Sequence, residues 1–219
     1  MLTIKILERM QKDQLFKRIQ TFRQVGIRNF EFTVRMFGYQ KLIITTEPTV
    51  LNHFEHLKEL ILLEDLLNYL KDEPKDLKIV LNLQDPNLEY RIKNSVEEWG
   101  LKEQIKYTGQ IEPMNFTPWD SPNIYYNVEN CLPNFYQFKE IKKTHFDVIH
   151  YFCRKYKMKN IRIHTKALSS DMLRWAKDSK LNLSVYGIET IQKAEELFDH
   201  GITQITMTDI VKPTIYKPM

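Results

Sequence analysis

Glycine, cysteine and long apolar runs are all scarce in this sequence of 219 residues. With only six glycines, the chain lacks the glycine-rich loops that cradle phosphates in nucleotide-binding folds. No apolar run reaches the ~18 residues that a membrane span needs, so no span is predicted. The first residues alternate like a β-strand and lack the apolar core of a secretory signal.

The two cysteines, Cys131 and Cys153, are isolated, and neither belongs to a metal-binding or redox motif. Reduced, buried cysteines are typical of cytoplasmic proteins, so we expect a cytoplasmic location. The formal net charge of +4 is small and its charges are evenly spread along the chain. This balance argues against nucleic acid as a partner.

Apolar residues, by contrast, are plentiful. They make up 42% of the chain, and twelve Phe and eleven Tyr are among them. This apolar content is enough for a packed core. The length favours one large domain over two small ones, and no linker, repeat or low-complexity segment interrupts the sequence. We therefore expect residues 1–219 to form a single domain.

The C-terminal stretch gives the clearest structural signal. Residues 183–190 are a short, apolar and β-branched run, which indicates a strand. Residues 191–200 have helical spacing behind Thr190 as a candidate N-cap, and Gly201 is suited to end that helix. Residues 202–207 form another strand pattern, so the stretch predicts a βαβ unit with parallel strands. The C-terminal ends of such strands share a rim, where parallel α/β folds place their sites.

The remainder of the chain alternates in the same way. Further strands are predicted at residues 2–7, 29–34, 41–46, 76–84, 104–108, 123–128 and 160–165, and helices at residues 15–25, 60–70, 88–99, 146–156 and 171–180. This alternation favours a closed (β/α)8 barrel, with an open doubly wound sheet as the alternative. About nine strand candidates stand against the eight of the barrel, so one is surplus or part of an extra hairpin. His164 is the one histidine expected to reach the rim.

Five short segments, in one order along the chain and each at a predicted strand end, resemble the motifs of a single family. Residues 30–34 (Phe-Glu-Phe-Thr-Val) resemble Ile-Glu-Leu-Asp-Val, residues 45–49 (Thr-Thr-Glu-Pro-Thr) resemble Phe-His-Asp-Pro-Thr, and residues 81–84 (Leu-Asn-Leu-Gln) resemble Ile-Glu-Ile-Lys. Residues 184–189, with Tyr186 at a Trp position, resemble Val-Trp-Thr-Val-Asn, and residues 201–209 resemble Gly-Val-Asp-Gly-Ile-Ile-Thr-Asp. The family is that of the glycerophosphodiester phosphodiesterases, a branch of the phosphatidylinositol-specific phospholipase C-like barrels.

The resemblance implies a catalytic mouth in which carboxylates hold a divalent cation, two histidines act as general acid and base, and Arg and Lys hold the phosphate. Most of these positions are substituted here. Glu8 and Thr46 replace the two histidines, and Gln84 replaces the phosphate-holding Lys, whereas Arg9 keeps the Arg. The insertion that caps the family's site is also missing, with only residues 50–59 in its place. We therefore expect negligible hydrolysis of glycerophosphodiesters.

The implied metal site is depleted as well. Glu31 keeps one metal carboxylate, but its Asp partner is Thr33 and the third carboxylate is Asn82. A hard cation such as Mg²⁺ or Ca²⁺ needs several oxygen ligands, preferably anionic ones. A rebuilt metal site would therefore need Glu31 together with Glu47 and Glu8.

Two function hypotheses follow. The first is a non-catalytic relative, without a cofactor, that binds a phosphorylated or polyol ligand, or a protein partner, through Arg9, Glu31, Asn82 and Tyr186. The second is a divergent metal-dependent glycerophosphodiester phosphodiesterase of lipid and glycerol metabolism, with Mg²⁺ or Ca²⁺ on Glu31 and Glu47.

Charge at the mouth leads to two further expectations. Glu31 is a candidate for a structural ion pair with Arg9 or Lys5, since charges in clefts mark both structural and ligand-binding sites. Because Glu8, Glu31 and Glu47 would repel an anion, we expect Arg9 to be taken up by a carboxylate. We also expect phosphate to bind weakly without metal.

Overall fold

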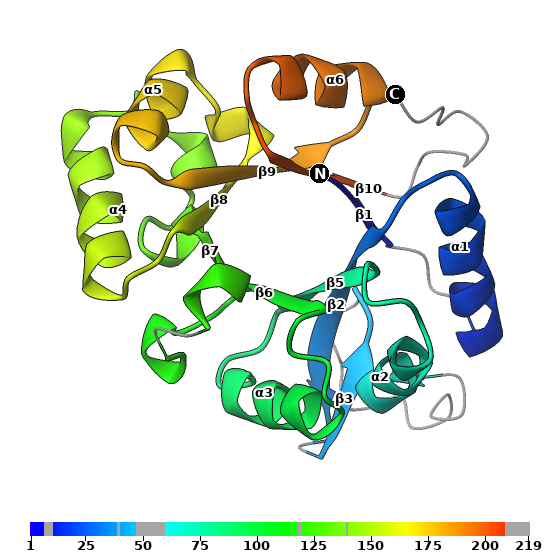
Figure 1. Ribbon diagram of the computed structural model, residues 1–219. Helices are drawn as coiled ribbons and strands as arrows, with labels where there is room; N and C mark the ends of the chain where they lie inside the picture. Colours follow the sequence, from blue (N-terminus) through cyan, green and yellow to red (C-terminus); the bar gives the residue numbers. More distant parts are fainter. Residues whose placement is uncertain (7–10, 39, 47–59, 118–119, 139, 209–219) are drawn as a thin grey trace.

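The structure, a computed structural model, describes residues 1–6, 11–38, 40–46, 60–117, 120–138 and 140–208. Parallel strands curl into a ring with the helices outside it (Figure 1). In chain order the strands of the ring are β1 (Leu2–Lys5), β2 (Asn29–Phe37), β5 (Lys78–Leu83), β6 (Ile105–Gly109), β7 (Tyr125–Asn127), β8 (Asn160–His164), β9 (Asn182–Ile188) and β10 (Gln204–Thr208). Because the helices lie on one side of the curled sheet, a doubly wound sheet with helices on both faces is excluded.

Parallel ladders join these strands in the order β7-β8-β9-β10-β1-β2-β5-β6. The two ends of this series, β6 and β7, meet at a seam. One parallel bridge links Tyr107 to Ile124, and Thr108 Oγ1 donates a hydrogen bond to the backbone oxygen of Tyr125 at 2.9 Å. The predicted parallel α/β sheet is thus confirmed, and its seam has a single bridge in place of a ladder.

Helices cover the outside of the ring. Those of the described residues are α1 (Lys12–Gln24), α2 (Leu63–Lys71), α3 (Glu89–Glu98), α4 (Lys143–Lys155), α5 (Ser170–Asp178) and α6 (Ile191–Asp199). Between the strands predicted at residues 104–108 and 123–128 the sequence predicts a loop and no helix, and the seam has this form in its described residues. There the chain from β6 to β7 makes only short 3-10 turns within its described residues, η2 (Pro113–Asn115) and η3 (Ser121–Asn123). Pro113 and Pro122 lie in these turns, and proline removes a backbone donor that a longer helix would need.

The C-terminal βαβ unit has the predicted construction. Thr190 Oγ1 accepts a hydrogen bond from the backbone N–H of Lys193 at 3.2 Å and so caps α6. Gly201 follows the helix with a φ of 83°, a left-handed conformation that glycine adopts without steric cost. The strands on either side, β9 and β10, are parallel neighbours.

The surplus strand belongs to an extra hairpin. β3 (Lys41–Ile44) runs antiparallel to the last residues of β2, and β4 (Ile61–Leu62) runs antiparallel to β3. The predicted helix at residues 60–70 therefore starts later, at Leu63, because the two preceding residues pair with β3. This hairpin extends beyond the eight parallel strands of the curled sheet.

Two layers of different chemistry lie on the two faces of the ring. Along β2, Phe30 and Phe32 are buried, and Phe30 packs against Phe22 of α1 with ring centroids 6.1 Å apart. Glu31 and Thr33 alternate with them and are buried on the inner face. The inner face is polar elsewhere too, with buried Thr3, Asn29, Asn82, Thr108, Asn160, Arg162, Ser184, Gln204 and Thr206. The apolar core therefore lies between the sheet and the helices, and the inside of the ring is polar.

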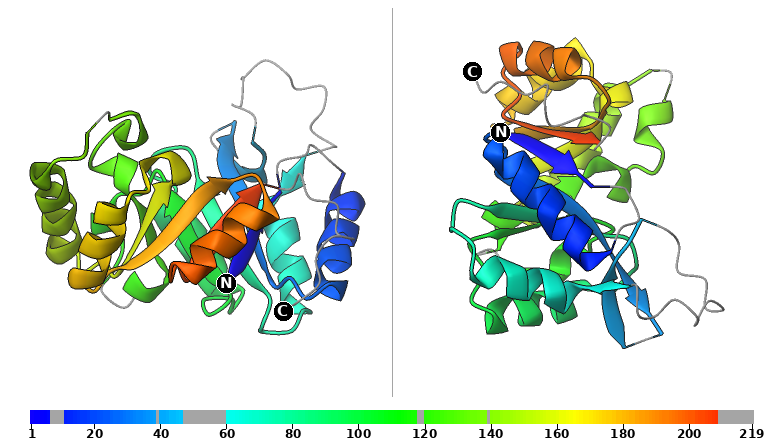
Figure 2. Two further views of the ribbon diagram at one scale, coloured as in Figure 1. Left: turned by 90° about the horizontal axis from the view of Figure 1, so that it is seen from above. Right: turned by 90° about the vertical axis from the view of Figure 1, so that its right-hand side faces the viewer.

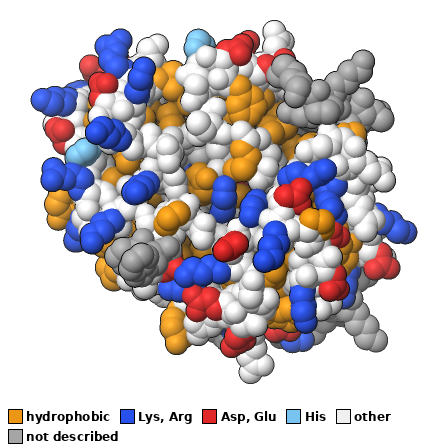
Figure 3. Space-filling view, in the orientation of Figure 1, with side chains coloured by type: hydrophobic (Ala, Val, Ile, Leu, Met, Phe, Trp, Pro, Cys, Tyr) orange, Lys and Arg blue, Asp and Glu red, His pale blue; other side chains and the backbone are white. Residues whose placement is uncertain are grey.

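The ring has two ends. In Figure 2 its strands run in one direction, away from the viewer of Figure 1, so Figures 1 and 3 look at their N-terminal ends. On that face Lys and Arg side chains gather over α4 and α5, with acidic side chains interspersed (Figure 3). The C-terminal ends, where the sequence predicts the site, lie on the opposite face. Across the ranges described above, no helix has the length and apolar content to cross a membrane.

Candidate functional site

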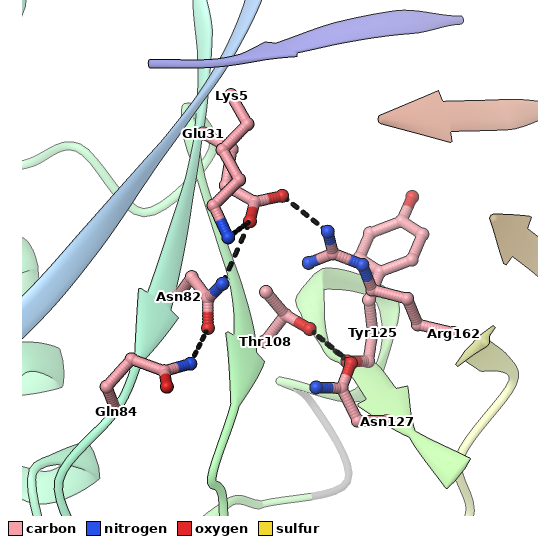
Figure 4. Close-up of polar contacts among 8 residues, drawn as sticks. All are labelled: Lys5, Glu31, Asn82, Gln84, Thr108, Tyr125, Asn127 and Arg162. Atoms are coloured by element: carbon pink, nitrogen blue, oxygen red, sulfur yellow. Dashed lines mark hydrogen bonds and ion pairs between the residues drawn. The ribbon is translucent and has the colours of Figure 1, made fainter. Parts of the chain in front are cut away.

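Glu31 is the centre of the polar contacts inside the ring (Figure 4). One carboxylate oxygen, Oε1, accepts a hydrogen bond from Asn82 Nδ2 at 2.9 Å and lies 3.4 Å from Lys5 Nζ. The other, Oε2, accepts a hydrogen bond from Arg162 Nη2 at 2.6 Å. The four side chains come from β1, β2, β5 and β8, and the site therefore spans the ring from one wall to the other.

Burial makes this arrangement electrostatically demanding. The Glu31 side chain is 0% exposed and that of Arg162 is 3% exposed, whereas 25% of the Lys5 side chain is exposed. Burial is the largest influence on the pKa of Glu31 and acts to raise it. The charges of Arg162 and Lys5, with the hydrogen bonds from Asn82 and Arg162, together outweigh burial and hold the pKa below its ordinary value. Glu31 is therefore an ionised, compensated carboxylate at neutral pH.

Amide and hydroxyl side chains continue the network toward the seam (Figure 4). Gln84 Nε2 donates to Asn82 Oδ1 at 2.7 Å, so that Asn82 can present its NH₂ group to Glu31. Across the seam, Thr108 Oγ1 lies 3.0 Å from Asn127 Oδ1 and shares its single hydroxyl proton between that oxygen and the backbone oxygen of Tyr125. These contacts fix the orientation of each amide around the central carboxylate.

A second group of side chains lies beside Arg162, on the β7 to β9 wall. The Arg162 guanidinium lies 4.8 Å from the centre of the Tyr186 ring, and the Tyr186 hydroxyl donates to Glu129 Oε1 at 3.1 Å. His164 makes an edge-to-face contact with Tyr186, with ring centroids 5.0 Å apart. Its Nδ1 accepts a hydrogen bond from the backbone N–H of Lys166 at 3.1 Å, which places the proton of the neutral ring on Nε2.

Proteins similar to this chain are found among solved structures, by their fold. No family model matches the sequence, and no curated protein matches it. A solved glycerophosphodiester phosphodiesterase from Parabacteroides distasonis superposes with a TM-score of 0.64 at 16% identity, covering 95% of this chain and 93% of that one. A phosphodiesterase from Oleispira antarctica, solved in complex with the product sn-glycerol-3-phosphate, gives a TM-score of 0.64 at 14% identity, with 95% and 93% covered. This chain has the fold of the glycerophosphodiester phosphodiesterases.

The resemblance inferred from the sequence is thereby confirmed at the level of the glycerophosphodiester phosphodiesterase fold. Enzymes of other activity share the same architecture. The tryptophan synthase α subunit of Legionella pneumophila superposes with a TM-score of 0.57 at 12% identity, covering 95% of this chain and 80% of that one. Function must therefore be argued from the side chains of the site.

Part of the predicted site is brought together. Glu31, Asn82 and Gln84 converge through hydrogen bonds, and Tyr186 joins them through Arg162. Thr46 follows β3 and is exposed. The remaining predicted residues, Glu8, Arg9 and Glu47, lie outside the described residues, so their convergence with the others stays a prediction.

Glu31 does form the ion pair considered from the sequence, and Lys5 is one of its partners. Its closer partner, Arg162, was missed, as was Glu129. The sequence did carry a signal for Arg162. It stands two residues before His164 in the alternating strand of residues 160–164, so the two side chains share a face. A histidine expected at the rim therefore implied an arginine beneath it.

The described residues do not fit a divalent cation. They contain no group of three or more His, Cys, Asp or Glu side chains that could hold a metal ion. Both oxygens of Glu31 already accept hydrogen bonds, from Asn82 and Arg162. A cation at this point would have to displace the buried guanidinium and would find one carboxylate among neutral amides, which is a poor ligand set for Mg²⁺ or Ca²⁺.

Replacing Arg162 by Met should destabilise the protein by about 3–5 kcal/mol, because it leaves the carboxylate of Glu31 buried with only Lys5 and Asn82 as partners. Urea denaturation of the variant measures this loss. Arg174→Met is the matched control, since the Arg174 side chain is 73% exposed and its replacement should change stability by less than ~0.5 kcal/mol. Equal effects of the two variants would contradict the pairing.

Acid should weaken the fold in part through Glu31. Its pKa is lowered in the folded state, so its contribution to stability is complete above the unfolded-state pKa of ~4.3. That contribution is lost as the pH falls through the lower, folded-state pKa. We expect the free energy of unfolding to fall more steeply below ~pH 4.5 in the unmodified protein than in Glu31→Gln. Parallel curves for the two proteins, measured by denaturation at a series of pH values, would show that Glu31 does not titrate differently on folding.

Proposed function

We propose that this chain is a non-hydrolytic protein of the glycerophosphodiester phosphodiesterase fold that binds a small phosphorylated polyol at the C-terminal end of its barrel. The observation that carries the proposal is the 2.6 Å contact between Arg162 Nη2 and Glu31 Oε2. By resemblance, Glu31 stands at a metal-carboxylate position of the family. In this chain an arginine supplies the positive charge that a metal would supply there.

Loss of hydrolysis also follows from the proton-transfer positions. Each acid or base catalyst contributes ~10²–10⁴-fold to a rate, and the two histidine positions of the family correspond to Glu8 and Thr46. A threonine hydroxyl does not ionise near neutral pH, so Thr46 cannot replace a histidine as general acid or base. His164 aligns with neither position, and its Nδ1 is occupied by the Lys166 backbone.

The charges at the centre of the site favour an anionic ligand. Among the central group, Lys5 and Arg162 bring two positive charges against the single negative charge of Glu31. From the sequence we expected Glu31 to repel an anion and phosphate to bind weakly without metal. Because Arg162 neutralises Glu31, we now propose that phosphate binds without metal. Lys5 is the more exposed cation and would contact the phosphate first. Arg9, the arginine kept from the family motif, would supply a bidentate contact.

The architecture that goes with this function is a closed (β/α)8 barrel without the capping insertion of the enzymes. The single bridge and the side-chain hydrogen bonds at the β6–β7 seam support closure. Residues 50–59 stand in the sequence where the family has its longer insertion. A mouth without that cap would leave a small ligand exchangeable with solvent.

Glycerophosphodiesters should not be hydrolysed by the purified protein, with or without Mg²⁺ or Ca²⁺, because proton transfer and metal binding are both impaired. Release of glycerol 3-phosphate from glycerophosphocholine, followed by a coupled dehydrogenase assay, measures this. Turnover above background that is abolished both by EDTA and by Glu31→Gln would identify a metal-dependent enzyme and overturn the proposal.

Glycerol 3-phosphate should bind in metal-free buffer, as measured by calorimetric titration in the presence of EDTA. Lys5→Gln should weaken this binding by about tenfold or more, since a charge-assisted contact is lost. Lys17→Gln, which removes an exposed lysine on the outer helix α1, should leave it unchanged. Absence of binding to the unmodified protein, or equal loss in both variants, would refute an anion site at the mouth.

A further inference from the structure

The group of side chains on the β7 to β9 wall makes no hydrogen bond to Glu31 and touches its network only where Arg162 meets the Tyr186 ring. Glu129 comes from the 3-10 turn η4 (Val128–Asn130) after β7, His164 ends β8, and Tyr186 lies near the end of β9. Tyr136, in the turn η5 (Phe135–Gln137), places its ring 5.3 Å from that of His164. Three aromatic rings and one carboxylate therefore line the wall next to Arg162.

Glu129 is incompletely paired in this wall. Oε1 accepts the Tyr186 hydroxyl at 3.1 Å, but Oε2 is buried and has no hydrogen-bond partner among the described residues. Burial raises the pKa of Glu129 and outweighs the opposing influence of nearby backbone N–H groups, the Tyr186 hydroxyl and the charge of Arg162. A buried carboxylate oxygen without a donor is unfavourable, so the site is suited to a ligand that brings one.

The surrounding charges select the kind of donor. A cationic donor would be repelled by the Arg162 guanidinium, which lies against the Tyr186 ring, and by Lys166, whose charge together with burial lowers the pKa of His164. An anion would be repelled by Glu129 itself. A neutral hydroxyl group meets neither obstacle, and the aromatic rings offer apolar faces to the carbon atoms that carry it.

Arg162 joins the two halves of the mouth. Its Nη2 atom donates to Glu31, and the same guanidinium lies under Tyr186. A ligand whose phosphate contacts Lys5 would extend across Arg162 toward Glu129.

From these contacts we infer that Glu129, His164 and Tyr186 form a subsite for the hydroxyl-bearing carbon skeleton of the ligand. Glu129 Oε2 accepts a hydrogen bond from a ligand hydroxyl, and the subsite distinguishes polyol phosphates from simple alkyl phosphates. The inference rests on the proposed function, since it assigns the second half of the same ligand.

Calorimetric titration of three phosphate monoesters into metal-free protein tests the subsite. Glycerol 3-phosphate carries two hydroxyls, propyl phosphate carries none, and phosphoethanolamine carries an ammonium in their place. The unmodified protein should bind glycerol 3-phosphate about tenfold more tightly than propyl phosphate, the effect expected of one hydrogen bond to a buried carboxylate. Phosphoethanolamine should bind no better than propyl phosphate.

Glu129→Ala should abolish the preference for glycerol 3-phosphate and leave the affinity for propyl phosphate unchanged. Glu129→Gln keeps the shape of the side chain, and it should reduce the preference if Glu129→Ala does not fold. Glu98→Gln, an exposed carboxylate on α3, is the matched control and should keep the full preference.

The titrations distinguish failure of the proposed function from failure of the subsite alone. If none of the three esters binds, the proposed function fails and the subsite fails with it. If glycerol 3-phosphate and propyl phosphate bind equally to the unmodified protein, the anion site stands and the subsite alone is refuted. Tightest binding of phosphoethanolamine would show that Glu129 pairs with a cation, which also overturns the hydroxyl subsite.

Discussion

The ion pair between Glu31 of β2 and Arg162 of β8 joins two strands on opposite walls of the ring. The two residues are 131 positions apart in the chain. Taking two charges out of water is costly, and their mutual attraction compensates only when the remaining hydrogen-bonding groups are also satisfied. Lys5 and Asn82 supply that support to the carboxylate. The pair therefore fixes the relative positions of four strands. A metal ion at Glu31 would have to compete with it.

The pair belongs to a sheet whose inner face is mainly polar. Barrels of this architecture commonly fill their interior with layers of branched apolar side chains, but here the apolar core lies outside the ring, between the strands and helices. The hydroxyls of Thr3, Ser184 and Thr206 are buried inside without partners among the described residues. The two faces of the sheet therefore differ in what they contribute: the outer face packs against the helices and stabilises the fold, and the inner face presents polar side chains.

This separation allows a glycerophosphodiester phosphodiesterase fold to persist while its inner side chains vary. The outer face requires only apolar side chains of suitable size, a condition that many sequences satisfy. The inner residues set the chemistry of the site, and here an arginine and a lysine neutralise the Glu31 carboxylate. The structural similarity to a protein of 16% identity therefore shows the fold of this chain. Its function depends on a few inward-facing side chains.

The sequence by itself determined the alternation of strands and helices, the C-terminal βαβ unit and the inward position of Glu31. These features depend on local rules: the two-residue period of a strand, the capping of a helix by Thr190 and the positive φ of Gly201. The same rules placed Glu31, Asn82 and Gln84 at strand ends, and their order along the chain carried the family resemblance. Local spacing also predicted a surplus strand, which the hairpin of β3 and β4 accounts for.

Only the tertiary structure decided which charges meet. No spacing rule relates residues 31 and 162, because their contact depends on the curvature of the sheet and on which strands face each other across the ring. The pairing of Tyr186 with Glu129 and the seam between β6 and β7 have the same origin. Strand periodicity specifies the face on which a side chain lies, but the curling of the sheet is what brings distant strands within hydrogen-bonding distance.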